Sequence, residues 1–262
     1  MLVFPLGPAG LGCGVGDSII NRLKGVSMRS DVIKVFIGYD QVESVAWHTM
    51  AHSILRQSSR PVAIVPVNLA NLKDIYTRVR DSKQSNEFSF SRFLVPYLCN
   101  YEGYGVFFDC DMMLRTDIAN IFQAVEQDPG KAVYVVKHDY EPRDEIKYLN
   151  TVQYKYPRKN WSSVMLWNCG HEANKAVTPE FVNTASPMDL HRFTWLPDDQ
   201  IGELNVRWNW LVGEYAEPPA DVMNVHWTVG GPYFLEYQDV DFSAEWFKEA
   251  ARMGFCAQRL KS

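Results

Sequence analysis

Short apolar runs alternate with longer amphipathic stretches through the first half of the chain. The runs are rich in β-branched and aromatic residues, as is typical of buried strands, and they cover residues 32–37, 61–67, 105–109 and 132–136. Between them, apolar residues recur at helical spacing over residues 42–55, 91–99 and 118–126. Asp40 and Glu43 have the spacing of a capping box at the start of the first helix. Strands that alternate with helices predict an α/β fold with a mostly parallel, Rossmann-like central sheet flanked by helices.

The second half of the chain has a less regular pattern. Short strands are expected over residues 161–167, 206–211 and 222–227, and a closing amphipathic helix over residues 243–253. We therefore expect a single domain over residues 31–262, in which the second half is smaller. Residues 1–30 are apolar and glycine-rich, but they lack the preceding strand and the later acidic residue of a dinucleotide-binding fingerprint. They are predicted to form a loosely attached N-terminal extension.

The composition is that of a globular protein with many aromatic side chains. Of 262 residues, 47% are hydrophobic and 22% are charged, which excludes disordered, collagen-like and coiled-coil chains. Aromatic residues make up 13% of the chain. Most aromatic side chains fill a core, but sugar rings and nucleobases also pack on such faces, so a ligand of this kind is indicated.

The charge of the chain excludes several classes of partner. Lys and Arg number 26 against 31 Asp and Glu, and there is no basic tract, which argues against binding to nucleic acid or to an anionic membrane. A phosphate-bearing ligand would have to be met by a metal or by a few placed cations. No run reaches the roughly 20 apolar residues of a membrane-spanning helix. Five cysteines without a Cys-x-x-Cys pair argue against a disulfide framework and a zinc site, so a reducing, cytoplasmic location is expected.

The most informative stretch is the acidic pair that follows the third predicted strand. Asp109 and Asp111 stand one residue apart at the end of the apolar run 105–108. Ligands of α/β sheets collect at the carboxyl ends of the strands, and two carboxylates there suit Mg²⁺ or Mn²⁺. A solvated turn with two acids is the alternative on spacing alone.

Two enzyme classes have an Asp-x-Asp at the end of a strand. In haloacid-dehalogenase-type phosphatases the first Asp is a nucleophile, which here would be Asp109. That motif normally lies on the first strand and continues Gly-Thr, whereas this chain places residues 32–104 before it and Met112-Met113 after it. The second class is the nucleotide-sugar glycosyltransferases.

Over residues 32–234 the chain resembles glycosyltransferase family 8, the glycogenin and bacterial galactosyltransferase group, which has the GT-A fold. Its motifs follow the order of that family. Ile37-Gly38-Tyr39-Asp40 resembles the uridine-binding loop, Arg92 lies in a segment that resembles the helix whose Arg reaches the nucleotide, and Asp109-Cys110-Asp111 resembles the DxD metal motif. Later, Asn168-Cys169-Gly170 resembles the Asn-x-Gly near the donor sugar, and Asp199-Gln200 resembles the Asp-Gln pair beside the reacting carbon. His226 begins a segment that resembles the family's late His-x-x-Gly, which supplies a third metal ligand.

The resemblance implies a metal-dependent transfer of a hexosyl group from a UDP-sugar to a hydroxyl acceptor, with retention at the anomeric carbon. The acceptor class stays open among glycans, lipid-linked acceptors and small molecules. The implied metal ligands are Asp109, Asp111 and His226, with Mn²⁺ or Mg²⁺ as the ion. The remaining implied roles are nucleotide-sugar contacts by Ile37, Gly38, Tyr39, Arg92, Asp109, Cys110 and Asn168, and catalysis by Gln200, Asp199 and Asp111.

One departure from the family pattern keeps a further alternative open. The family commonly follows its His with a Lys that meets the diphosphate, but this chain has Gly231-Pro232-Tyr233. Either Arg92 and the metal carry the phosphate charge, or the chain is a sugar- or nucleotide-binding module that has lost turnover. An inverted product would instead call for a carboxylate base such as Asp198, Asp199 or Glu203.

Overall fold

The computed structural model describes residues 32–80, 84, 86–139 and 158–254. The predicted extension over residues 1–30 lies outside the described residues, and so do Cys13 and Cys256. The described residues, from Val32 on, belong to one compact unit. None of the helices within the described part of the chain is long and apolar enough to cross a membrane.

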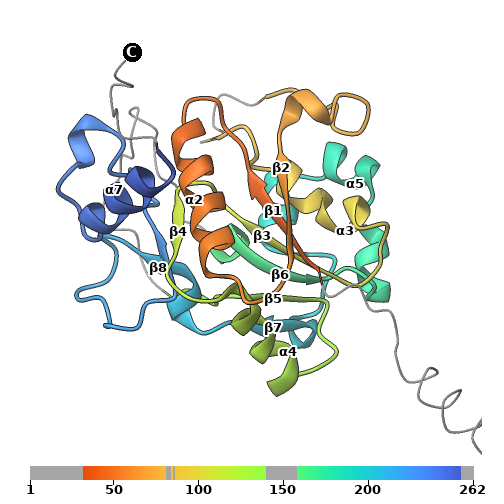
Figure 1. Ribbon diagram of the computed structural model, residues 1–262. Helices are drawn as coiled ribbons and strands as arrows, with labels where there is room; N and C mark the ends of the chain where they lie inside the picture. Colours follow the sequence, from red (N-terminus) through yellow and green to blue (C-terminus); the bar gives the residue numbers. More distant parts are fainter. Residues whose placement is uncertain (1–31, 81–83, 85, 140–157, 255–262) are drawn as a thin grey trace, which may run out of the picture. The chain divides into compact units, whose positions relative to one another are not determined.

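A six-stranded mixed sheet forms the centre of this unit (Figure 1). Its strand order is β2-β1-β3-β6-β5-β7. The strands are β1 Ile33–Gly38, β2 Val62–Val67, β3 Tyr104–Phe108, β5 Val133–Val135, β6 Val164–Asn168 and β7 Ile201–Glu203. Strand β6 runs antiparallel to both of its neighbours, and the other pairs are parallel. The predicted α/β fold with a mostly parallel sheet is therefore confirmed.

The helices that the periodicity predicted are present, together with two short helices, Pro179–Thr184 and Pro187–His191, that it did not predict. The helices are α2 Ser44–Gln57, α3 Val95–Leu98, α4 Gln123–Gln127, α5 Pro179–Thr184, α6 Pro187–His191 and α7 Ser243–Arg252. Helix α2 packs on β1, and α3 packs on β3 and β6. The predicted helices over residues 91–99 and 118–126 each begin as a 3₁₀ turn, at Ser91–Leu94 and Ile118–Phe122. Strands β1 and β3 are buried almost throughout, as their apolar composition requires.

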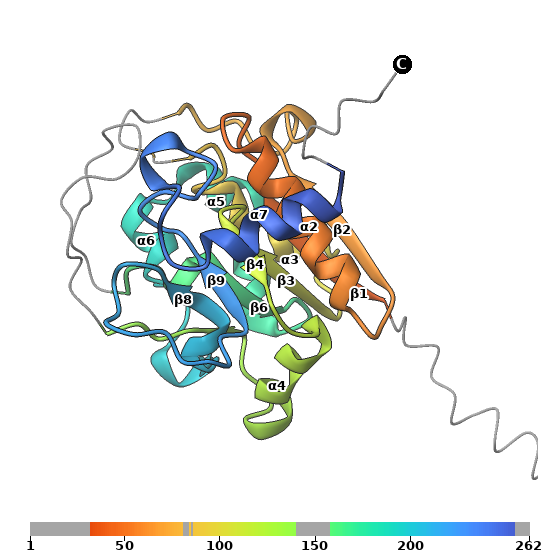
Figure 2. The same ribbon diagram turned by 60° about the vertical axis from the view of Figure 1, so that its left-hand side comes forward.

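A second, three-stranded sheet continues from the first beside the acidic pair. It has the order β4-β9-β8, formed by β4 Met112–Leu114, β9 Asn224–His226 and β8 Trp210–Leu211. Its own core contains Met113, Trp210, Val225, Trp227 and Trp246 of α7. Figure 2 shows α7 crossing near α2, and the two helices are in contact. Much of the aromatic content of the chain is therefore used as core.

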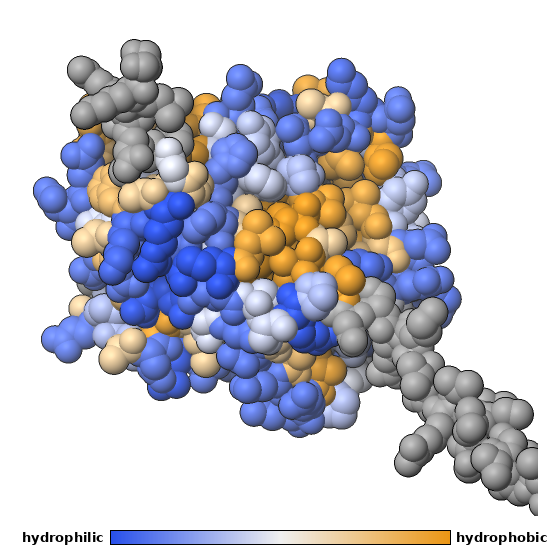
Figure 3. All heavy atoms as spheres, in the orientation of Figure 1, coloured by the Kyte–Doolittle hydropathy of each residue, from blue (hydrophilic) through white to orange (hydrophobic). Residues whose placement is uncertain are grey.

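Strand β2 is the outer strand of the large sheet, and its side chains alternate between half-buried and exposed. In Figure 3 an apolar area lies over β2, whose Val65 is exposed. Pro66 lies in this strand opposite Ile37. Proline is tolerated on an edge strand because the outward side needs no hydrogen-bond donor.

Two local predictions were wrong. The expected strand over residues 206–211 is a 3₁₀ turn, Val206–Asn209, followed by the two-residue β8, because the Asn205 side chain accepts the Arg207 amide and starts a turn. The expected capping box does not form, since helix α2 begins at Ser44 with Glu43 as its N-cap and no side-chain cap. Asp40 instead accepts hydrogen bonds from the Val42 and Glu87 amides.

Candidate metal centre

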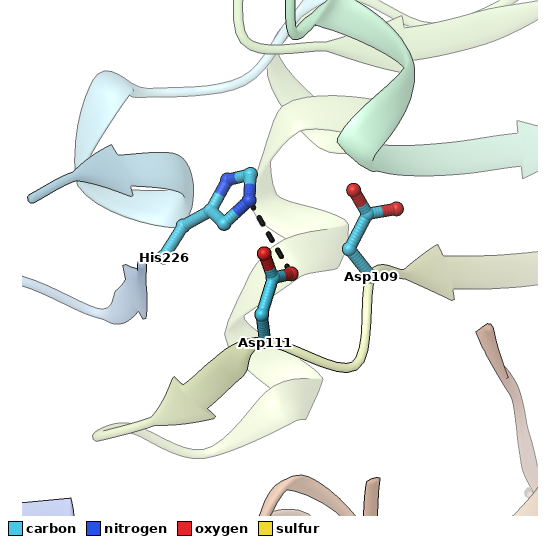
Figure 4. A group of neighbouring side chains, drawn as sticks. All are labelled: Asp109, Asp111 and His226. Atoms are coloured by element: carbon cyan, nitrogen blue, oxygen red, sulfur yellow. Dashed lines mark ion pairs between the residues drawn. The ribbon is translucent and has the colours of Figure 1, made fainter. Parts of the chain in front are cut away.

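Three side chains from distant parts of the sequence converge beside the carboxyl end of β3 (Figure 4). Asp109 follows β3, Asp111 precedes β4, and His226 ends β9. Strands β4 and β9 pair antiparallel with Met112 opposite His226, and the Trp227 amide donates to the Asp111 carbonyl at 3.0 Å. This register places Asp111 directly beside His226. One ligand atom from each of the three residues lies within 4.8 Å of the others.

The three side chains form a donor set that suits a divalent cation. Asp109, Asp111 and His226 are only 7%, 8% and 2% exposed. Burying two neighbouring carboxylates is costly unless positive charge compensates them. Two carboxylates and one imidazole offer the oxygen and nitrogen ligands that Mn²⁺ or Mg²⁺ accepts. The residues present therefore fit a metal of this kind, as the sequence predicted.

Part of that compensation comes from Arg92, which is itself 4% exposed. Its Nη1 lies 2.7 Å from Asp109 Oδ1 and also donates to the Ser162 carbonyl at 2.9 Å. The guanidinium lies over the rings of Phe88 and Phe107. The sequence placed Arg92 on the nucleotide, but in this structure Arg92 is held against Asp109. It fixes one oxygen of that carboxylate.

The predicted uridine loop lies at the same edge of the sheet. Strand β1 is parallel to β3 with Ile37 opposite Phe108, so Ile37-Gly38-Tyr39 ends level with the acidic pair. A Cβ on Gly38 would come within 2.3 Å of the Phe88 ring, which explains the need for glycine there. Tyr39 is half-buried and makes an edge contact with Trp47 at 6.2 Å between ring centroids. Stacking of Tyr39 on a base stays a prediction.

A buried acid, Glu43, and a half-buried phenol, Tyr233, lie next to the metal ligands. Tyr233 donates to Glu43 Oε1 at 2.5 Å, and the Cys110 thiol lies 3.9 Å from Glu43 Oε2. Burial, with the charge of Glu43 added, raises the pKa of Tyr233 and that of Cys110. Both groups therefore stay protonated at neutral pH. The Cys110 side chain is fully buried, so only its backbone is left for the predicted nucleotide contact.

The structure does not bring Asn168 to this site. Because β6 is antiparallel to β3, Val164 lies opposite Phe108 and Asn168 lies opposite Tyr104. Four residues of strand separate Asn168 from the acidic edge by about 13 Å. The Asn168 side chain donates to the Lys131 carbonyl at the opposite edge of the sheet. The interpretation of Asn168-Cys169-Gly170 as the segment near the donor sugar is corrected accordingly.

Gln200 and Asp199 lie at that opposite edge too. Strand β7 is parallel to β5, with Ile201 opposite Val133, so the residues before β7 lie away from the acidic pair. The Gln200 carbonyl accepts the Ala132 amide at 2.9 Å, and the Asp199 carbonyl accepts Lys131 Nζ at 2.9 Å. The catalytic role of these two residues was implied by the resemblance of Asp199-Gln200 to the family's Asp-Gln pair, but here the pair precedes β7 and lies at the end of the sheet away from Asp109 and Asp111. Asn168 lies there because β6 is antiparallel to β3, whereas Asp199 and Gln200 lie there because they precede a strand that runs in the same direction as β3.

Sequence reasoning missed the polar residues that do reach the centre. Asn160, Ser162 and Ser163 precede β6 and therefore lie at the acidic edge, where the Asp109 amide donates to the Ser163 carbonyl at 3.0 Å. Asn209 contacts His226 directly. A signal was present, because polar residues stand immediately before the apolar run 164–167. Reading that run as an antiparallel strand would have found them.

A second histidine, His138, also lies near the centre. His138 follows β5, whose carboxyl end shares the edge of Asp109. Its Nδ1 is 2.6 Å from the Tyr215 hydroxyl. Burial, and then the charge of His226, lowers the pKa of His138 to about 3. His138 is therefore a neutral group beside the metal ligands at physiological pH.

Comparison with known protein sequences finds one curated plant relative. No protein-family model matches the chain. It is 42% identical over 240 residues to Protein CDI of Arabidopsis thaliana, covering 89% of this chain and 92% of that protein.

Solved glycosyltransferase structures share the fold at low sequence identity. The apo bifunctional glycosyltransferase WbbM matches with a TM-score of 0.58 and 14% identity, over 86% of this chain and 50% of WbbM. Glycosyltransferase GlyE of Streptococcus pneumoniae TIGR4 matches with a TM-score of 0.55 and 13% identity, over 83% of this chain and 60% of GlyE. The galactosyltransferase LgtC, solved with donor and acceptor sugar analogs, matches with a TM-score of 0.53 and 10% identity, over 84% of this chain and 96% of LgtC. The chain thus spans about half of WbbM but almost all of LgtC, and it has the GT-A fold.

Proposed function

The chain belongs to the family of Protein CDI of Arabidopsis thaliana, and we propose that it is a metal-dependent glycosyltransferase that moves a hexosyl group from a UDP-sugar to a hydroxyl acceptor. The observation that carries the proposal is the buried group of Asp109, Asp111 and His226 at the carboxyl edge of a GT-A sheet. Ligands of such sheets bind at this edge.

In this proposal Asp109, Asp111 and His226 hold Mn²⁺ or Mg²⁺. A divalent cation supplies charge that neutralises the diphosphate as it leaves the sugar. Arg92 keeps the Asp109 carboxylate in place through the 2.7 Å contact. The loop of Ile37, Gly38 and Tyr39 lies on the same edge and is proposed to bind the uridine. The acceptor is a glycan, a lipid-linked hydroxyl or a small molecule.

The stereochemical course stays a prediction from the resemblance to family 8, which implies retention. Gln200 and Asp199 lie at the opposite edge and have no part in the proposed mechanism. The anomeric configuration of the product, measured by NMR, distinguishes retention from inversion.

One observation favours a second candidate, a sugar-nucleotide-binding module without turnover. The Asp-Gln pair that the sequence assigned to the reacting carbon is remote from the metal centre. The phosphatase alternative is not favoured, because Asp109 is buried and held by Arg92 within a glycosyltransferase fold.

The test is metal-dependent cleavage of the donor. The chain is incubated with UDP-sugars and Mn²⁺ without acceptor, and the release of UDP is measured. We expect slow release that the Asp111→Ala variant abolishes and that Asp74→Ala, at an exposed position far from the centre in sequence, leaves unchanged. UDP-sugar binding without any release would support the binding module. Mn²⁺-dependent hydrolysis of simple phosphate esters, lost in Asp109→Ala, would support a phosphatase.

A further inference from the structure

Asn209 is a fully buried amide between the metal centre and the start of β6. It ends the 3₁₀ turn Val206–Asn209 and has no exposed surface. Its Oδ1 lies 2.8 Å from His226 Nδ1. Its Nδ2 donates to Ser163 Oγ at 2.7 Å and to the Asn160 carbonyl at 3.2 Å.

The hydrogen bonds around Asn209 fix which way its amide points. Ser163 donates its own hydroxyl proton to the Asn160 carbonyl at 2.7 Å, so Ser163 Oγ is left as an acceptor. A carbonyl oxygen can only accept. Both neighbours on this side of Asn209 therefore require its NH₂ group. The amide oxygen then faces His226, whose Nδ1 must carry a proton to donate to it.

The proton on Nδ1 determines whether Nε2, the other ring nitrogen of His226, can act as a metal ligand. In a neutral ring with a protonated Nδ1, Nε2 carries a lone pair. His226 Nε2 lies 3.4 Å from Asp111 Oδ1, so two electron-pair donors face each other across a short gap. A divalent cation held by both atoms would replace that repulsion with attraction to each of them. Metal-bound histidines usually donate their second ring N–H to a neighbouring oxygen in this way.

We propose that Asn209 is a positioning residue that holds His226 in the tautomer protonated at Nδ1, so that Nε2 faces the metal position beside Asp109 and Asp111. The inference rests on the metal of the proposed function and adds a residue that no motif in the sequence marks. Ser163 and the Asn160 carbonyl support this role, because their hydrogen bonds hold the Asn209 amide in the orientation that His226 requires.

The first experiment is a calorimetric titration of the full chain with Mn²⁺ alone. We expect Asn209→Ala to bind Mn²⁺ about 10–100-fold more weakly than the natural chain, as loss of such a partner typically does. The matched control is Asn224→Ala. Asn224 is also fully buried and donates to the Trp208 carbonyl, but its side chain has no contact with the His226 ring among the hydrogen bonds found for the described residues. Its variant should bind Mn²⁺ within about threefold of the natural chain.

The second experiment reads the tautomer without any metal and does not depend on a folded variant. Long-range ¹H–¹⁵N NMR of the metal-free natural chain at neutral pH reports which ring nitrogen of His226 is protonated, and the signals are assigned by their loss in His226→Gln. We expect Nδ1 to carry a proton, as the contact with Asn209 Oδ1 requires.

The outcomes separate this inference from the proposed function. A His226 ring without a proton on Nδ1, Asn209→Ala binding Mn²⁺ as tightly as the natural chain, or an equal loss in Asn224→Ala would each overturn the role of Asn209. Failure of the natural chain to bind Mn²⁺, with Nδ1 protonated, would instead count against the metal of the proposed function.

Discussion

Arg92 stabilises the metal centre, and its contribution to the free energy of unfolding can be measured without any substrate. It is the cation on the buried Asp109 carboxylate, at 2.7 Å. Removing one partner of a buried ion pair leaves the other charge without compensation, which typically costs about 3–5 kcal/mol. We therefore expect Arg92→Ala to lower the free energy of unfolding by about that amount in metal-free urea titrations. Saturating Mn²⁺ should reduce the deficit, because the ion also compensates Asp109.

The control for this prediction is an ion pair at the surface. Lys175 and Glu172 contact each other at 2.6 Å, but their side chains are 57% and 82% exposed. Lys175→Ala should change the free energy of unfolding by less than about 1 kcal/mol. A deficit of that small size in Arg92→Ala, with or without Mn²⁺, would show that Arg92 is not needed to compensate Asp109.

His191 makes the stability of the fold depend on pH. It is half-buried beside Ser162, with its Nδ1 2.8 Å from Ser162 Oγ. Burial, followed by the charges of Arg92 and Arg78, lowers the pKa of His191 from 6.5 to about 3. Between these two values the unfolded chain binds more protons than the folded chain, so acid favours unfolding. The stability that the neutral ring provides is complete above pH 6.5 and decreases as the pH falls toward 3.

Urea titrations at several pH values test this dependence. Below pH 6.5 His191 should contribute a loss that approaches about 1.4 kcal/mol per pH unit. His191→Gln keeps a hydrogen-bonding side chain but cannot be protonated, so its free energy of unfolding should fall less steeply between pH 6.5 and pH 5. If the free energy of unfolding fell equally steeply with pH in the natural chain and in His191→Gln, the pH dependence would not come from His191.

At the scale of the elements, apolar periodicity predicted where the regular helices and strands lie, but it did not predict the direction in which a strand runs in the sheet. Strand β1, helix α2 and helix α7 follow from apolar spacing, because each buries one face or all of itself. An apolar run such as β6 looks the same in either direction, however. Its antiparallel orientation comes from pairing with β3 and β5, which no local pattern encodes. The same limit explains why Asp109 and Asp111 were found while Asn209 was missed, since the first pair directly follows a strand and Asn209 reaches the centre through tertiary packing.

Helix α7 shows how a distant element is joined to the first half of the chain. Glu249 has a side chain only 3% exposed and accepts hydrogen bonds from Arg56 and Arg252, with His52 at 2.8 Å. Burial alone would raise the pKa of Glu249, but its hydrogen bonds to Arg56, Arg252 and His52 lower it. The carboxylate therefore stays ionised and joins α7 to α2. Because α2 also packs on β4, this contact supports the second sheet, which carries His226.

At the scale of the whole molecule, the acidic balance of the chain agrees with a metal-centred site. The net charge is −5, and Arg92, which lies at the centre, already forms an ion pair with Asp109. If the proposed function holds, much of the positive charge that a diphosphate needs comes from the ion that Asp109, Asp111 and His226 hold. The charge of the whole chain then matters less than the few atoms around these three residues.

The residues before the compact unit are expected to be dispensable for folding and activity. The compact unit begins at Val32, and every residue assigned above to the metal centre lies within it. Strand β1, which begins at Ile33, lies between β2 and β3 in the sheet. Removing residues 1–27, so that the chain starts at Met28, should leave the melting temperature within about 2 °C and the Mn²⁺-dependent release of UDP unchanged, because a change of 1 kcal/mol would shift a chain of this size by about 2–4 °C. Removing residues 1–36 deletes most of a central strand and should abolish cooperative unfolding. A drop of many degrees in the shorter truncation would show that residues 1–27 are part of the folded unit.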